Sequence, residues 1–246
     1  MGDTTLIDLS RMMALRTKLD VAANNVANIE TTGFRGQQLS FQEYLEPVPG
    51  REIGVKPERP LSLVNAVLPF TSSTGGAIET TGNPLDLAID GNAYFAVQTD
   101  QGERYTRDGS FTLDEQGRLV TAGGQPVLTN RGVVTIPPDA GEVSVDPSGQ
   151  ISTRLGALGR LRLVSFDNRA SLQAVGGNLF ESVRAPSGTN ASSVRLVQGA
   201  LERSDVQPTL EMAKLAEINR AYEMAAKLLK DTLDPDDMDK LADVPE

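Results

Sequence analysis

Apolar residues recur at alternating spacings of three and four in residues 5–30, near the N-terminus of the chain. This is the spacing of the a and d positions of a heptad, and it predicts a helix with one continuous apolar seam. The seam consists of Met12, Leu15, Leu19, Ala22, Val26 and Ile29. A second helix with a matching seam is predicted at residues 209–232, where the seam residues are Leu215, Ile218, Tyr222, Ala225 and Leu229.

Three asparagines, Asn24, Asn25 and Asn28, occupy the end of the first helical pattern. Asparagine is a weak helix former because its side chain competes for nearby backbone groups. In the heptad these residues fall beside or opposite the seam. They are therefore either solvated residues of an ordinary amphipathic helix or polar contacts with another surface, and the spacing alone leaves both readings open.

The end of this helix is predicted at the sequence Thr31-Thr32-Gly33-Phe34. A glycine just after a helical pattern is typical of the left-handed residue that terminates a helix, and Gly33 fits that position. Phe34 is then expected to make the hydrophobic contact that often accompanies such an end.

The region between the two helices divides into an extended arm and a β-rich part. Residues 35–80 contain Pro47, Pro49, Pro57, Pro60 and Pro69, which break any helix, and one or two short strands are expected there, for example at 61–68. From residue 81 to residue 200, runs of four to six strand-forming residues alternate with turns rich in Gly and Asp. That spacing predicts a small β sandwich or barrel.

The predicted fold class is α+β, with paired, coiled-coil-like terminal helices, an extended arm and a small all-β domain. The expected segments are an assembly helix at 1–34, the arm at 35–80, the β domain at 81–200, a second assembly helix at 201–233 and an acidic tail at 234–246. Each seam has to be buried, and the simplest solution packs one helix against the other. A two-helix pair of this length is marginal in water, so the other faces are expected to pack on further copies of the chain.

Composition excludes several functions. The formal net charge is −10 over 246 residues, without the basic cluster that a nucleic-acid-binding protein usually has. The chain contains neither cysteine nor histidine, which excludes thiolate nucleophiles, histidine bases and the usual zinc ligand sets. We therefore expect no catalytic residue, no metal, no cofactor and no enzymatic activity. No apolar run approaches the length of a membrane span, and no cleaved signal peptide is expected at the N-terminus.

Three separated blocks resemble the axial proteins of the bacterial flagellar rod and hook. The first is "ANNVANIETTGFR", which matches the family pattern A-N-N-x-A-N-x-x-T-x-G-F-[RK]. The second block is central and contains "TGNPLDLAIDGNAYFAVQ" and "YTRDGSFTLDEQGRLVTAGGQPVL". The third is "QGALERSDVQPTLEMAKLAEINRAYEM" near the C-terminus. They occur in the family's order and are spread over most of the chain, from residue 23 to residue 224.

The resemblance implies a structural subunit of the flagellar basal-body rod, a helical tube in the periplasm that transmits torque for motility. Its expected partners are copies of itself, other rod proteins and the flagellar type III export apparatus, with no nucleic acid and no membrane insertion. With the resemblance, the asparagines are expected to contact neighbouring subunits. The expected assembly interface consists of Leu15, Leu19, Asn24, Asn25, Val26, Asn28, Thr32, Gly33, Phe34, Leu215, Ile218, Tyr222 and Leu229.

Within the family, the chain length and the short proline-rich region resemble the proximal rod protein most, and the distal rod protein is the alternative. The tail departs from the family pattern, because residues 231–246 hold seven acidic residues and one lysine. From a different class, a soluble coiled-coil adaptor that displays a β module also fits the pattern, as does, less well, an exported enzyme that uses carboxylates.

Overall fold

The computed structural model describes residues 2–46, 61–71, 75–166, 172–182, 187–188 and 194–232. The predicted acidic tail at 234–246 lies outside these residues. Contacts divide the chain into two compact units. We call residues 1–27, 37–70 and 207–246 the helical unit, and residues 28–36 and 71–206 the β unit.

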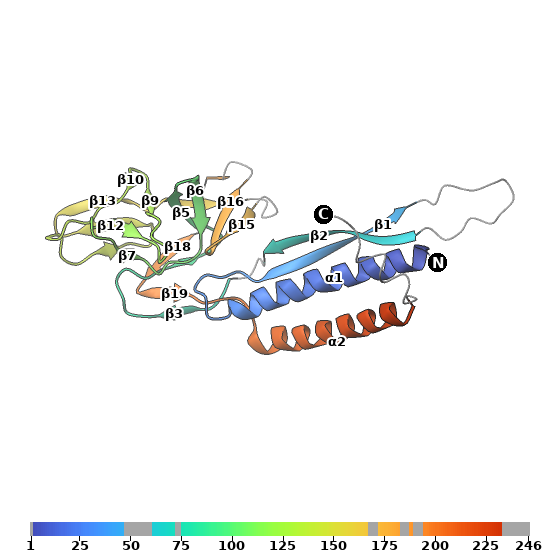
Figure 1. Ribbon diagram of the computed structural model, residues 1–246. Helices are drawn as coiled ribbons and strands as arrows, with labels where there is room; N and C mark the ends of the chain where they lie inside the picture. The colour runs from blue at the N-terminus through green and yellow to red at the C-terminus, as the bar shows by residue number, and fades with distance from the viewer. Residues whose placement is uncertain are drawn as a thin grey trace. The chain divides into compact units, whose positions relative to one another are not determined.

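The helical unit contains two long helices, α1 (Gly2–Ala27) and α2 (Pro208–Thr232). They pack side by side, as Figure 1 shows. The predicted second helix agrees with α2 to within a residue at its N-terminal end, where Pro208 lacks only a hydrogen-bond donor that the first turn does not use. The first helix ends at Ala27, three residues before the predicted end.

Two strands accompany the helices in this unit, β1 (Gln37–Glu46) and β2 (Leu61–Thr71). Among the strands that the structure describes, these two form a sheet of their own, and β1 lies along α1 (Figure 1). The sequence predicted a strand at 61–68, and β2 extends three residues beyond it; the strand at 37–46 was not predicted. Pro69 is compatible with β2 because a two-stranded ribbon leaves outer edges where no donor is needed.

The described strands of the β unit form one six-stranded sheet and several sheets of two or three strands, in place of the single sandwich or barrel that was expected. The six-stranded sheet has the order β15-β16-β6-β5-β14-β17. Its strands are β5 (Tyr94–Thr99), β6 (Gly102–Thr106), β14 (Leu163–Ser165), β15 (Leu172–Gly176), β16 (Leu179–Ser182) and β17 (Ser187–Gly188).

The other described strands of the β unit form smaller sheets. Strands β11, β12 and β13 form a three-stranded sheet, and β3 pairs with β19, β4 with β18, β7 with β8 and β9 with β10. Their bounds are β3 (Ile78–Thr80), β4 (Leu87–Asp90), β7 (Thr112–Leu113), β8 (Leu119–Val120), β9 (Leu128–Thr129), β10 (Gly132–Val133), β11 (Ser144–Val145), β12 (Gln150–Thr153), β13 (Gly156–Arg160), β18 (Arg195–Gln198) and β19 (Ala200–Glu202).

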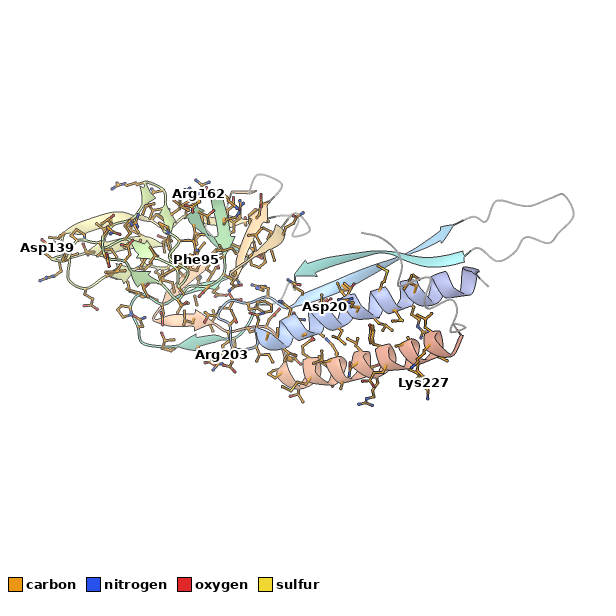
Figure 2. All side chains as sticks on the ribbon, viewed as in Figure 1. Asp20, Phe95, Asp139, Arg162, Arg203 and Lys227 are labelled. Carbon is orange, nitrogen blue, oxygen red and sulfur yellow. The ribbon has the colours of Figure 1, made fainter. Side chains whose placement is uncertain are left out.

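Strand β5 is the centre of the β unit because both of its faces are buried. Ala93, Phe95 and Val97 point into one apolar cluster, and the alternate residues Tyr94 and Ala96 into another. Phe95 lies among the strands in Figure 2, whereas Asp139 and Arg162 lie at the periphery of the unit. A continuous apolar run such as "AYFAV" is what a strand buried on both faces requires.

Three hairpins of this unit close with the same turn, Thr-x-x-Gly. The hydroxyl groups of Thr99, Thr129 and Thr153 donate to the carbonyl groups of Gly102, Gly132 and Gly156 at 2.7, 2.7 and 3.3 Å. Each of these glycines has a positive φ, between 97° and 122°. The glycine-rich turns read from the sequence are therefore confirmed as hairpin turns at these three places.

Candidate functional site

The predicted seams occupy the covered sides of the two helices. On α1, Ala22 is buried, and Leu15, Leu19 and Val26 are half-buried. On α2, all four of the expected interface residues are half-buried: Leu215, Ile218, Tyr222 and Leu229. The apolar seams are thus the sides of α1 and α2 that the chain itself covers most.

Both helices also carry apolar side chains that the chain leaves exposed. Met13 on α1 is 64% exposed, and Met212 and Met224 on α2 are 57% and 66% exposed. A hollow of about 320 Å³ in the helical unit adjoins this surface and is lined by Arg11, Glu217, Arg220, Ala221, Met224, Ala225 and Leu228. Exposed apolar surface on a helix that already buries one seam is typical of a site that packs on another protein.

The three asparagines have three different environments. Asn25 is 4% exposed, and its side-chain amide donates to the carbonyl of Gln37 at 2.9 Å and accepts from the N–H of Gln37 at 2.8 Å. Asn28 is half-buried and accepts a hydrogen bond from the hydroxyl of Thr31 at 3.1 Å, whereas Asn24 is exposed. Asn25 therefore uses its amide for two hydrogen bonds within its own chain.

Gly33 does not terminate the helix, because α1 has already ended at Ala27. Its φ of 65° is left-handed as expected, but the reason is a close approach within the β unit. A Cβ atom at this position would lie 2.5 Å from the backbone carbonyl of Arg107. The Gly33 N–H donates to the carbonyl of Glu202 at 2.7 Å, which places the glycine between two distant parts of the chain.

The neighbours of Gly33 bind the β unit in the same way. The carbonyl of Thr32 accepts from the Asn178 side chain at 2.7 Å, and the carbonyl of Phe34 accepts from the N–H of Asp205 at 3.3 Å. The N–H of Gly36 donates to the Asp205 carboxylate at 2.6 Å. Residues 31–36 therefore form a docked segment of the β unit. Because α1 ends at Ala27, Phe34 does not lie at a helix end, where its hydrophobic contact was expected.

A buried ion cluster lies beside this docked segment. One carboxylate oxygen of Glu202 is 3.1 Å from the Arg35 guanidinium, and the other is 3.0 Å from the Arg107 guanidinium. The three side chains are 4%, 2% and 3% exposed, in the order Arg35, Glu202 and Arg107. We call these three residues the Glu202 clamp. It was not predicted from the sequence, because its members are far apart along the chain.

Arg107 makes further contacts within the β unit. Its guanidinium also donates to the carbonyls of Gly91 and Ala93 and lies over the ring of Tyr94, 5.7 Å from the ring centre. Burial lowers the pKa of Arg107 to about 10, a shift that the Glu202 carboxylate opposes and the nearby Arg35 reinforces. The guanidinium thus remains charged at neutral pH. Both oxygens of the Glu202 carboxylate face guanidinium groups, an arrangement that holds chain segments together.

Within the described residues, neither helix is long and apolar enough to cross a membrane. The geometry is that of a protein that acts through surfaces: a helix pair with exposed apolar residues and a β unit in which distant segments are fixed by buried ions.

Comparison with known families matches three parts of the chain. Residues 6–35 match the family described as "Flagella basal body rod protein", and residues 88–153 match "Flagellar hook protein FlgE/F/G D1 domain". Residues 197–237 match "Flagellar basal body rod FlgEFG protein C-terminal". The first and third matches contain the two helices and the Glu202 segment, and the second contains β5 and much of the β unit.

Individual relatives match over nearly their whole length. The chain is 39% identical to the flagellar basal-body rod protein FlgF of Caulobacter vibrioides, over 94% of each chain. It is 33% identical to FlgF of Mesorhizobium japonicum over 96% of each chain. It is also 33% identical to the flagellar basal-body rod protein FlgG of Bacillus subtilis, over 90% of this chain and 91% of that one.

The helix pair, the docked N-terminal segment and these matches together define a structural protein of the flagellar axis. The chain belongs to the family of flagellar basal-body rod proteins. The resemblance read from the three sequence blocks is therefore confirmed, and with it a structural role in the rod.

Proposed function

We propose that the chain polymerises through its terminal helices, with copies of itself and with other rod proteins, into a helical tube that transmits torque. The observation that carries this proposal is the exposed apolar surface of the helices, in particular Met212 and Met224 on α2. These side chains lie outside the covered seam, so a second protein surface is needed to remove them from water.

The seams are proposed to pack in coiled-coil fashion within each subunit. Leu15, Leu19 and Val26 on α1 and Leu215, Ile218 and Tyr222 on α2 have the heptad spacing that interlocking side chains require. Leu229 continues the seam toward the end of α2. Their half-buried state supports this pairing. In this arrangement the seam residues contribute to assembly by holding the two helices together, and the exposed side chains make the contacts with neighbours.

Asn24 and Asn28 keep their proposed role at the interface between subunits, because neither is buried as completely as Asn25. A polar contact at a helix interface fixes one register, whereas a purely apolar face tolerates a shift. Thr32, Gly33 and Phe34 are proposed to act indirectly, because their backbone atoms fix the segment that follows α1 to the β unit.

The place of the subunit is proposed to be the proximal rod, in the periplasm, after passage through the flagellar export apparatus. The chain length and the short proline-rich segment between the helices support the proximal position. The distal rod is the alternative, and the match to relatives called FlgF as well as FlgG is compatible with either. The five predicted segments, with their bounds at 34, 80, 200 and 233, stay part of this proposal.

The test compares Met224→Glu with Met224→Leu in cells that express either variant at the normal level. The glutamate places a charge where an apolar contact is proposed, and the leucine preserves the apolar surface. We expect complete rods in isolated basal bodies with leucine and few or none with glutamate, while both subunits are folded and exported. Normal rod yield with the glutamate variant would contradict assembly through this face. Discrete small oligomers of the purified wild-type chain, with no rod-like polymers, would favour the adaptor.

A further inference from the structure

The chain passes between its two units at four places, next to residues 27, 36, 70 and 206. Residues 28–36 supply the first two connections, the segment beginning at Thr71 the third and the segment ending at Val206 the fourth. On the β-unit side, residues from all three segments meet at the Glu202 clamp. Arg35 comes from the first, Glu202 itself from the last, and Gly76 from the middle one, through an N–H that donates to the Glu202 carboxylate at 3.2 Å.

We propose that the Glu202 clamp is a cooperative anchor, which binds the segments 31–36, 75–77 and 202–205 to the β unit only together. One carboxylate is shared among Arg35, Arg107 and the Gly76 N–H. Withdrawal of Arg35 or Gly76 therefore removes a partner of Glu202, and withdrawal of Glu202 removes a partner of the other two. In a rod subunit such an anchor couples the segment that follows α1 to the segment that precedes α2.

Burial makes the sharing energetically strong. Removing one partner of a buried ion pair leaves a charge without compensation and costs several kcal/mol, far more than breaking a pair at the surface. Both guanidinium groups and the carboxylate are at least 96% covered, as their exposures of 4%, 3% and 2% show. If Glu202 left, two cations would remain close together in a site with little water. If Arg35 left, the carboxylate oxygen that it faces would lose its charged partner and retain the Gly76 N–H.

Backbone hydrogen bonds link the same three segments, so the ions do not act alone. The N–H groups of Gly33 and Arg203 donate to the carbonyls of Glu202 and Ala77, at 2.7 and 2.9 Å. The N–H of Gly36 donates to the Asp205 carboxylate at 2.6 Å, and the N–H of Asp205 donates to the carbonyl of Phe34 at 3.3 Å. These two bonds join the first segment to the last. Gly76 allows the close packing, since a Cβ atom there would overlap the carbonyl oxygen of Arg203.

Hydrogen exchange of the full-length chain provides the test, with the amides of Gly33, Gly36, Gly76, Arg203 and Asp205 as reporters. In Arg35→Gln we expect exchange to accelerate at all five, on the order of a hundredfold, the size that corresponds to breaking a buried ion pair. Amides of β5 should exchange as in the wild type, because the variant leaves both apolar clusters of the β unit intact. Glu202→Gln should show the same pattern with a larger acceleration.

Arg203→Gln is the matched control, because it removes the same type of side chain next to the clamp. Arg203 is 50% exposed and pairs at the surface with Glu30 and Glu79, so little acceleration is expected. Acceleration in Arg35→Gln confined to 31–36, with Gly76, Arg203 and Asp205 unchanged, would show independent docking and overturn the proposal. So would equal acceleration by the control. If Glu202→Gln does not fold, the Arg35 variant decides alone, because it retains the Glu202–Arg107 pair. None of these results depends on polymerisation.

Discussion

The Asn25 side chain forms a closed pair of hydrogen bonds with the backbone of Gln37: it donates to the carbonyl at 2.9 Å and accepts from the N–H at 2.8 Å. This is the pairing that a residue of a neighbouring strand would offer, supplied here by a helix side chain. Gln37 is the first residue of β1, so the Asn25 side chain holds the start of this strand against α1. Asparagine is a weak helix former, and its two hydrogen bonds with Gln37 compensate for the lower intrinsic stability of the helix.

Asn25→Ala should therefore destabilise the helical unit although alanine is the better helix former. The variant removes the side-chain partner of the N–H and of the carbonyl of Gln37, which are part-buried, and an unsatisfied buried group costs about 1–3 kcal/mol. The direct measurement is amide exchange at Gln37, which should accelerate strongly. Asn24→Ala is the matched control, because Asn24 is the exposed neighbour and should leave Gln37 unchanged. Unchanged exchange in Asn25→Ala would mean that the side chain does not hold the strand.

Gly33→Ala should destabilise the docked segment by more than backbone strain alone. Gly33 and Gly82 have similar left-handed φ values, 65° and 78°, but a Cβ atom at Gly82 would meet nothing within 4 Å. The left-handed conformation costs a non-glycine residue roughly 1–2 kcal/mol, and Gly82→Ala should show only that cost. At Gly33 the methyl group also displaces the backbone of Arg107. Thermal unfolding of the two variants checks this, and equal shifts would refute the close packing.

The helices were predictable because their signal is local and repeated. The heptad seam with Leu215 and Ile218 located α2 almost to its ends, and the seam around Leu15 and Leu19 located most of α1. The end of α1 was misplaced, because Gly33 has the sequence signature of a helix stop. Its actual neighbour, Arg107, is distant in sequence, and a single sequence contains no local trace of such a contact.

The β unit shows the same division between local and distant information. Turns were readable from glycine, as at Gly102 and Gly132 in the Thr-x-x-Gly hairpins. The order of the strands in the six-stranded sheet could not be predicted, because β16 pairs with β6 and β17 with β14 across long intervals of sequence. The Glu202 clamp was not predicted for a related reason: a glutamate at the end of a strand is usually exposed to solvent, and only the fold reveals that this one is buried.

Two aspartates of the β unit should influence acid unfolding in opposite directions. Burial raises the pKa of Asp108 above its ordinary value of 3.8, although hydrogen bonds from Ser110 oppose the shift. Hydrogen bonds from Ser148 and Gln150 lower the pKa of Asp146. The folded protein therefore prefers protonated Asp108 and ionised Asp146 relative to the unfolded chain. Asp108 becomes a cost to stability as the pH rises above about 3.8, whereas Asp146 adds stability that is lost as the pH falls through its lowered pKa.

Asp108→Asn should accordingly gain stability relative to the wild type as the pH rises above the ordinary aspartate value of about 3.8. Asp146→Asn should lose stability relative to the wild type as the pH rises from below that value. Urea unfolding of the three proteins at a series of pH values measures both differences. Because asparagine retains the oxygen that accepts the Ser110 and Ser148 hydrogen bonds, the comparison isolates the charge. Two differences with the same sign would contradict the assigned environments.

The two sides of the helix pair should respond differently to the same substitution. Leu19→Asp and Ile218→Asp place a charge on the covered seams, where a carboxylate without a partner is costly. We expect them to separate the helices in the monomer, with loss of helical circular dichroism, while the apolar core around Phe95 stays protected in hydrogen exchange. Met224→Asp places the same charge on an exposed side chain, so the monomer should keep its helical content.

All three substitutions should prevent complete rods, but for different reasons, and the monomer measurements distinguish them. The seam variants remove the helix pair on which assembly depends, whereas the Met224 variant preserves the pair and blocks its contact with the next subunit. Mixing each purified variant with an excess of wild-type chain adds a sharper comparison. A folded Met224 variant should still bind a growing end through its unaltered surfaces and stop further growth, because the next subunit finds a charge at the contact. An unpaired seam variant should not bind at all and should leave wild-type growth unchanged. If the seam variants instead retain their helices and assemble, the pairing of α1 with α2 through these residues is wrong, and the exposed methionines must be assigned to some other contact.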